Sequence, residues 1–196
     1  MKKILYIFLV VLLFCSSAIA EVFTLRNGVQ FGMTLNEIEK LEPLKRVTST
    51  NKDVYMYGYG IIANIDDSGV EYHFDKDGKL YSLELDLASG KKQYYTCKQD
   101  YEKINSMLKD KYGAPLGNKN ASSYFIRGKE FSGILSAYSL FQMMSTGILY
   151  DEWIIENEFG YMKIDHSCFY KGGDAGHFLE YTFFTDEDIK SLQNDI

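Results

Sequence analysis

The sequence predicts an α+β fold in which helices pack on one face of an antiparallel sheet. One observation is strict alternation over residues 82–87, where leucines alternate with polar and acidic residues, as in a sheet with one buried and one solvated face. A second is a single apolar stripe at three- and four-residue steps over residues 96–112, which is typical of an amphipathic helix. A third is the order helix, strands, helix, strands, which suggests two related units.

Residues 1–20 are predicted to be a signal peptide and not part of the fold. Two lysines precede an uninterrupted apolar run over residues 4–14, and Ala18 and Ala20 frame a small-x-small cleavage signal. We therefore expect cleavage after Ala20 and an exported protein, either periplasmic or extracellular. The apolar run is too short to span a membrane comfortably, so no stable span is expected after cleavage.

The charge of the chain excludes some partner classes. The full sequence of 196 residues carries a formal charge of −6, and loss of the leader makes it −8 because the leader holds two lysines and no acid. An acidic chain without a basic cluster is a poor candidate for binding nucleic acid or an anionic membrane. Neither nucleic acid nor an anionic membrane surface is therefore an expected partner.

The chain has three cysteines, of which one lies in the predicted leader and two in the remaining chain. Cys15 leaves with the leader, and the bulky Phe14 before it argues against lipid attachment there. Cys97 and Cys168 remain as an even pair in an exported chain, which predicts a disulfide worth roughly 4 kcal/mol in the chain-entropy model. The alternatives are two buried free thiols and, after that, a catalytic cysteine.

The first predicted unit covers residues 21–92. Thr34 and Glu37 have the Thr-x-x-Glu spacing of a capping box, which predicts a helix over 34–42 that Pro43 ends. The other elements expected in this unit are a short strand over 21–31 with a turn at 26–28, a polar loop over 45–53, strands over 54–65, 70–74 and 80–87, and turns over 66–69 and 75–78.

The second predicted unit covers residues 93–196 and is expected to share a core with the first. Thr96 and Gln99 predict a second capping box, and Gly113 and Pro115 are placed to end the helix over 96–112. The elements expected after it are a loop over 118–123, a strand over 124–126, a turn over 127–129, a helix over 134–144 (a strand also fits), strands over 149–156, 161–168 and 178–184, a hairpin turn over 157–160, a glycine-rich loop over 172–176 and a terminal helix capped by Thr185.

The segment Phe31-Gly32-Met33-Thr34 resembles the Gly-Met-Thr helix opening of BamE/SmpA-like small lipoprotein domains and of the tandem units in β-lactamase-inhibitory-protein-like folds. The segment over 112–115 is similar to the Gly-x-Pro helix ending common in that group. Trp153, followed by a hairpin and a Tyr-rich last strand, resembles the second half of many uncharacterised secreted bacterial proteins of this kind. The resemblance implies an exported helix-plus-sheet module that acts by protein contact, and it assigns no functional residue.

The three histidines are the first residues to consider for chemistry. His73 lies mid-strand, where a packed or solvent-facing side chain is expected. His166 and His177 flank a loop with Asp174, which makes a metal site conceivable, but the spacing matches no compact ligand pattern. Asp165-His166-Ser167-Cys168 places acid, base and nucleophile side by side, although neighbours on a strand point to opposite faces. A secreted hydrolase using His166, His177 and nearby acids is therefore the first alternative function.

Two loops and an aromatic stripe complete the candidates. Residues 75–78 lack the length and the terminal Glu of a calcium loop, and the glycines over 172–176 do not join a strand to a helix as in a phosphate loop. Tyr55, Tyr57 and Tyr59 suit a β core, and they are also the best candidates for an exposed carbohydrate- or wall-binding face, the second alternative.

The sequence as a whole predicts a non-enzymatic binding or envelope-associated protein without a cofactor, a metal or a catalytic residue.

Overall fold

The structure is a computed structural model that describes residues 23–47, 53–88, 93–116, 123–126, 129–132, 147–171 and 174–189. It confirms the α+β class. Its main feature is a six-stranded antiparallel sheet in the order β1-β2-β3-β8-β7-β6, with β4 and β5 as a separate hairpin. The elements are the 3₁₀ turn η1 (Arg26–Gly28), α2 (Leu35–Ile38), β1 (Val54–Ile62), β2 (Ile65–Phe74), β3 (Leu80–Asp86), α3 (Tyr94–Tyr112), β4 (Ser123–Ile126), β5 (Lys129–Ser132), β6 (Gly147–Asn157), β7 (Gly160–Lys171) and β8 (Asp174–Phe184).

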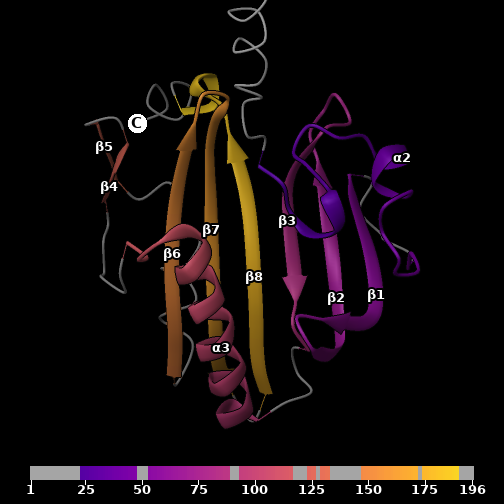
Figure 1. Cartoon of the computed structure of the whole chain (residues 1–196), viewed down its shortest axis with the longest axis vertical. Coiled ribbons are helices and arrows are strands. Elements are labelled where there is room, and N and C mark those ends of the chain that lie inside the picture. The colour runs from indigo at the N-terminus through magenta and orange to yellow at the C-terminus, as the bar shows by residue number, and fades with distance from the viewer. Residues whose placement is uncertain are drawn as a thin grey trace, which may run out of the picture.

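The sheet is built from two runs of three strands that meet at its centre (Figure 1). β1, β2 and β3 follow α2, whereas β6, β7 and β8 follow α3. The last strands of the two runs, β3 and β8, pair antiparallel, with Leu83 opposite Tyr181 and Leu85 opposite Leu179. One continuous sheet therefore joins the two halves of the chain.

α3 covers one face of β6, β7 and β8, as Figure 1 shows. Ile104 and Leu108 of the helix are buried in the same apolar cluster as Ile164 and Trp153 of the sheet, and the Trp153 ring N–H donates to the Gly113 carbonyl at 2.9 Å. This bond fixes the end of the helix to β6. The predicted C-terminus at Gly113 is correct, since its φ of 83° is one that glycine adopts without steric cost.

In the first half of the chain, a buried carboxylate connects the segment after α2 to the sheet. Glu42 lies just after α2, and its side chain accepts hydrogen bonds from Tyr72 (2.5 Å), Arg26 (2.8 Å) and the Leu44 amide (3.0 Å). Its side chain is fully buried, so these donors replace the water that the charge has lost. Burial and the Glu42 carboxylate together raise the pKa of Tyr72.

The predicted helix over 34–42 is shorter than expected. Regular helix stops at Ile38, whose carbonyl accepts from the amides of both Leu41 and Glu42 and so closes a tight turn before the proline. The capping at its start is confirmed, because the Glu37 carboxylate accepts from the Thr34 amide and hydroxyl, each at 2.7 Å. These two hydrogen bonds lower the pKa of Glu37.

Three other boundary predictions are wrong. The β1–β2 turn is at Ala63 and Asn64, both with positive φ as a two-residue hairpin requires, so residues 66–69 belong to β2. Thr96 does not cap α3, because the Cys97 amide already bonds the Gln93 carbonyl and the helix begins three residues earlier. The loop expected over 172–176 is in part strand, since β8 starts at Asp174. In addition, no strand was predicted at the position of β5. The helix expected over 134–144 lies outside the described residues.

Candidate functional site

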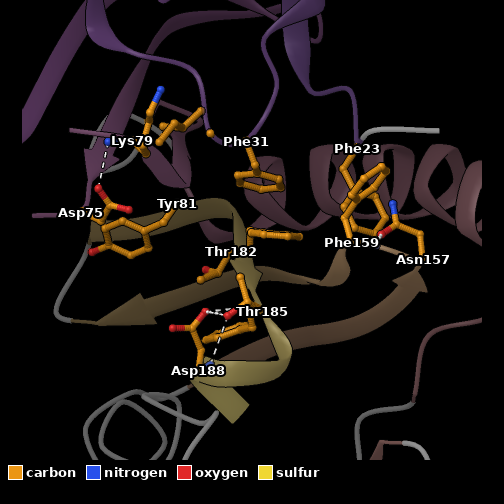
Figure 2. A pocket seen from close by; sticks show the side chains of 14 residues that line it. Phe23, Phe31, Asp75, Lys79, Tyr81, Asn157, Phe159, Thr182, Thr185 and Asp188 are labelled. Carbon is orange, nitrogen blue, oxygen red and sulfur yellow. Dashed lines mark hydrogen bonds between the residues drawn. The ribbon is translucent and has the colours of Figure 1, made fainter. Parts of the chain in front are cut away.

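An apolar groove of about 770 Å³ lies at one end of the sheet, where both halves of the chain contribute to its wall (Figure 2). The first half supplies the turn before α2 and the β2–β3 hairpin. The second half supplies the β6–β7 turn and the end of β8. The lining residues used below are Phe23, Phe31, Asp75, Lys79, Tyr81, Phe159, Phe183 and Asp188.

Aromatic residues from both halves of the chain line the groove: Phe23, Phe31, Tyr81, Phe159, Phe183 and Phe184. The Phe183 ring at the end of β8 stacks on Phe31 at a centroid distance of 5.4 Å, and it meets the edge of Phe23 at 6.1 Å. Phe159, in the turn between β6 and β7, is 50% exposed, and Tyr81 is 41% exposed. Exposed aromatic rings that line a hollow are typical of a binding surface, because solvated apolar area is costly.

Backbone contacts hold these rings in place. The Gly32 amide donates to the Leu80 carbonyl, and the Leu80 amide donates to the Met33 carbonyl, each at 2.9 Å, so the Gly-Met-Thr turn is clamped to β3. At the other wall, Gly160 has a φ of 149° and lies so close to β8 that an added Cβ would be 2.4 Å from the Phe184 carbonyl oxygen. The groove thus depends on two glycine turns that no other residue would fit without strain.

The rim of the groove carries charge of mixed sign with an acidic excess. Asp75 accepts from the Asp77 and Lys79 amides, each at 2.9 Å, which confirms the predicted hairpin turn at 75–78. Asp188 accepts from the amide and the hydroxyl of Thr185, each at 2.7 Å, which confirms the predicted cap there. These bonds fix the position of two carboxylates at the rim, whereas Lys79 supplies one ammonium group among the described lining residues.

The two histidines of the hydrolase alternative do come together, but under α3 and far from solvent. His166 on β7 and His177 on β8 are both fully buried, and their Nε2 atoms are 3.0 Å apart. The Tyr101 ring of α3 stacks on His166 at 4.3 Å. Burial, followed by the neighbouring His177, lowers the pKa of His166 well below its usual value, so His166 is neutral at physiological pH.

A carboxylate and the predicted cysteine pair border the histidines. Asp151 accepts from the Tyr101 hydroxyl at 2.8 Å and from the Asn105 side-chain amide at 2.6 Å. Cys97 and Cys168 lie at disulfide distance, with Cα atoms 6.1 Å apart, and both are fully buried. Acid, base and sulfur are therefore close in space, but the strand and helix around them leave no exposed surface on any imidazole or sulfur atom for a substrate to reach.

The remaining sequence candidates do not form a site. Tyr57 is 3% exposed and packs on Tyr72, so an exposed tyrosine face that includes it is wrong, and Tyr55 packs edge-on against Phe74. The side chain of Tyr59 lies outside the described residues, as do Ala18 and Ala20. His73 lies near the end of β2, directly before its last residue, and not mid-strand as predicted. Its side chain is partly exposed and lies near Glu71.

The sheet face opposite α3 has a feature that sequence reasoning missed. The registers of four strand pairs align five acids in one row across β2, β3, β8, β7 and β6: Glu71, Glu84, Glu180, Asp165 and Glu152. Lys163 neutralises one end of the row, with its Nζ 2.7 Å from Asp165. At the centre, burial first and then Glu180, Glu71 and Asp86 raise the pKa of Glu84 to about 7.

Sequence reasoning also missed the groove, because its phenylalanines come from four separate segments that only the β3–β8 pairing brings together. The signal available was the placement of phenylalanines beside turns, at 31 and 159. Comparison with protein families, curated proteins and solved structures finds no match to this chain. Within the part of the chain that the structure describes, no helix is long and apolar enough to cross a membrane.

Proposed function

We propose that this chain is an exported, non-enzymatic binding protein that holds apolar side chains of a partner protein in the phenylalanine-lined groove. The observation that carries the proposal is the cluster of Phe23, Phe31 and Phe183 beside the half-exposed Phe159. Interface energy concentrates in a few aromatic anchors seated in apolar pockets. The leader-like residues 1–20 and the Cys97–Cys168 pair support export, since disulfides persist in oxidising compartments.

The charge of the rim indicates which segment of a partner would fit. Asp75 and Asp188 outnumber Lys79, and the whole chain carries a formal charge of −6. Complementary charge steers association and selects among partners. The occupant that fits best is an extended peptide segment with an aromatic or large aliphatic side chain beside a lysine or arginine.

The two alternatives are less well supported by the geometry. A hydrolase would need His166 or His177 to reach a substrate, and both imidazoles are fully buried. A carbohydrate platform on β1 would need exposed coplanar tyrosines, and Tyr57 is part of the core. The groove, in contrast, presents its rings to solvent.

Peptide display on the full chain tests the proposal directly. We expect selected peptides to share an aromatic or large aliphatic residue next to a basic one, and to bind more weakly at higher salt. Phe159→Ser removes an anchor from an exposed turn and should weaken binding of a selected peptide by at least about 10-fold, the effect of losing about 1.4 kcal/mol.

Ile61→Ser is the matched control, since Ile61 is 67% exposed and lies beside the β1–β2 turn, at the other end of the sheet. It should leave peptide affinity unchanged. The proposal is refuted if both variants lose affinity equally, or if the selected peptides have no apolar residue in common. Far-UV circular dichroism of each variant confirms that the fold is retained.

A further inference from the structure

Four residues with metal-binding side chains gather beneath the first turns of α3, at the opposite end of β8 from the groove. Cys97 is on the helix, His166 and Cys168 are two residues apart on one face of β7, and His177 lies directly opposite Cys168 on β8. All four side chains are fully buried. Two sulfurs and two imidazoles form one of the ligand sets of structural zinc sites, which are closed to solvent.

The geometry of the imidazoles already suits a shared ion. Their Nε2 atoms converge to 3.0 Å, and two nitrogens bound to one tetrahedral zinc at about 2.0–2.1 Å lie about 3.3 Å apart. Two bare lone pairs would repel at this distance, so one hydrogen lies between the rings in the oxidised protein. A cation bound to both nitrogens would take the place of that hydrogen.

The two cysteines of the cluster are paired with each other, and disulfide sulfurs are not the thiolates that bind metals. In the arrangement that the structure shows, no three His, Cys, Asp or Glu side chains among the described residues are placed to hold a metal ion together. We propose that reduction of the Cys97–Cys168 disulfide converts this cluster into a closed Cys₂His₂ site for Zn²⁺, with Cys97, Cys168, His166 and His177 as ligands. Disulfide and metal would then exclude one another. This inference is independent of the peptide groove.

The chemistry balances with a named reductant. A dithiol transfers two electrons and two protons to the disulfide and itself becomes a disulfide, leaving thiols on Cys97 and Cys168. Binding of Zn²⁺ releases both thiol protons, since thiolates are the ligands. The hydrogen between the imidazoles moves to a ring Nδ1. The Nδ1 of His166 can receive it, because that buried atom has no hydrogen-bond partner among the described residues.

The surrounding side chains would hold the ligands in position. Tyr101, one helical turn after Cys97, stacks on the His166 ring and donates its hydroxyl hydrogen to Asp151. The ring therefore fixes the plane of His166, and the carboxylate fixes the ring. Outer contacts of this kind orient metal ligands, and their loss costs 10- to 100-fold in metal affinity in other proteins.

Titration with Co²⁺, a spectroscopic substitute for Zn²⁺, tests the site in the full chain. The protein is prepared once oxidised and once refolded in a dithiol, and excess reductant is removed before the metal is added. We expect the reduced chain to bind one Co²⁺, with sulfur-to-cobalt charge-transfer bands and the visible bands of a tetrahedral site. The oxidised chain should show neither. Zn²⁺ should displace the Co²⁺ and protect both thiols from a mild oxidant.

Variants separate this four-ligand site from binding by thiols alone. His177→Gln should weaken metal binding to the reduced chain by more than about 100-fold, beyond the effect of losing an outer contact. His73→Gln, on the opposite sheet face, is the matched control and should bind as the unaltered chain does. Circular dichroism of the oxidised variants, in which the disulfide still joins α3 to β7, checks the fold. The proposal would be overturned by metal uptake that is equal in the oxidised and reduced chains, or by uptake that His177→Gln leaves unchanged.

Discussion

Glu84→Gln should make this protein more stable at alkaline pH and leave its stability near pH 4.5 unchanged. Glu84 lies mid-row on the acidic sheet face, and its folded-state pKa is about 7, against an ordinary value of 4.5. An acid with a raised pKa binds its proton more tightly in the folded state. Its contribution is therefore complete below pH 4.5 and is lost as the pH rises through 7. At 1.36 kcal/mol per pKa unit, the loss by pH 8 is about 3 kcal/mol.

Urea unfolding at pH 4.5 and pH 8, at constant ionic strength, measures this effect. We expect the variant to exceed the unaltered chain by up to about 3 kcal/mol at pH 8 and to match it at pH 4.5. Glu158→Gln, in the exposed β6–β7 turn, is the control and should change neither value. An equal gain at both pH values would show that Glu84 does not titrate in this range, and the reasoning would fail.

In the same unfolding experiment, protonation of His166 changes the stability with pH in the direction opposite to Glu84. Its pKa is lowered in the folded state, so the unfolded chain takes up the proton first and stability falls as the pH drops below 6.5. The groups that face this imidazole are His177 and the Tyr101 ring, with Asp151 beyond the ring. One proton changes the free energy of unfolding by at most about 1.36 kcal/mol per pH unit. Between pH 4.5 and 6.5 the two titrations oppose each other, and Glu84→Gln should reveal the histidine slope.

Two further substitutions test how the packing of each half of the chain is held. Tyr72→Phe should lower the free energy of unfolding by about 1.5–3 kcal/mol, because the buried Glu42 carboxylate loses a charge-assisted donor. Urea unfolding measures this loss, and a value under about 0.5 kcal/mol would contradict the expectation. Gly160→Ala should destabilise by more than about 1 kcal/mol and weaken peptide binding, since the new Cβ would contact the Phe184 carbonyl and the Phe183 ring. Gly58→Ala is its control, because a Cβ there meets only the Gly69 Cα, at 4.0 Å. An equal loss of stability in both variants would refute the steric argument.

Local patterns predicted the elements of the fold well, because each depends on neighbours in sequence. The leucine alternation in β3 and the cap formed by Thr34 and Glu37 were both readable from a few residues. The prediction failed where tertiary contacts override local preference. Ala63 is a poor turn residue by type, yet it turns with positive φ because the pairing of β1 with β2 requires the hairpin there.

The candidate sites could not be predicted to the same extent, because they depend on which strands pair. Phe31 and Phe183 become stacked only when β3 and β8 join the two halves of the sheet. The histidines were recognised as a pair in sequence, but they were placed beside a loop. β7 and β8 in fact extend to Lys171 and Asp174, and this extension turns a loop region into a buried strand pair.

The position of the two proposed sites along β8 makes them separable by experiment. His177 lies near the start of this strand and Phe183 near its end, with Leu179 and Tyr181 between them on the same face. Leu179 is buried in the core and Tyr181 packs against it, so a change in the groove must displace these side chains before it reaches the cysteines. Loss of an exposed ring such as Phe159 leaves that packing intact. A groove variant that altered metal uptake would therefore indicate that β8 moves as a unit and that the two sites are coupled.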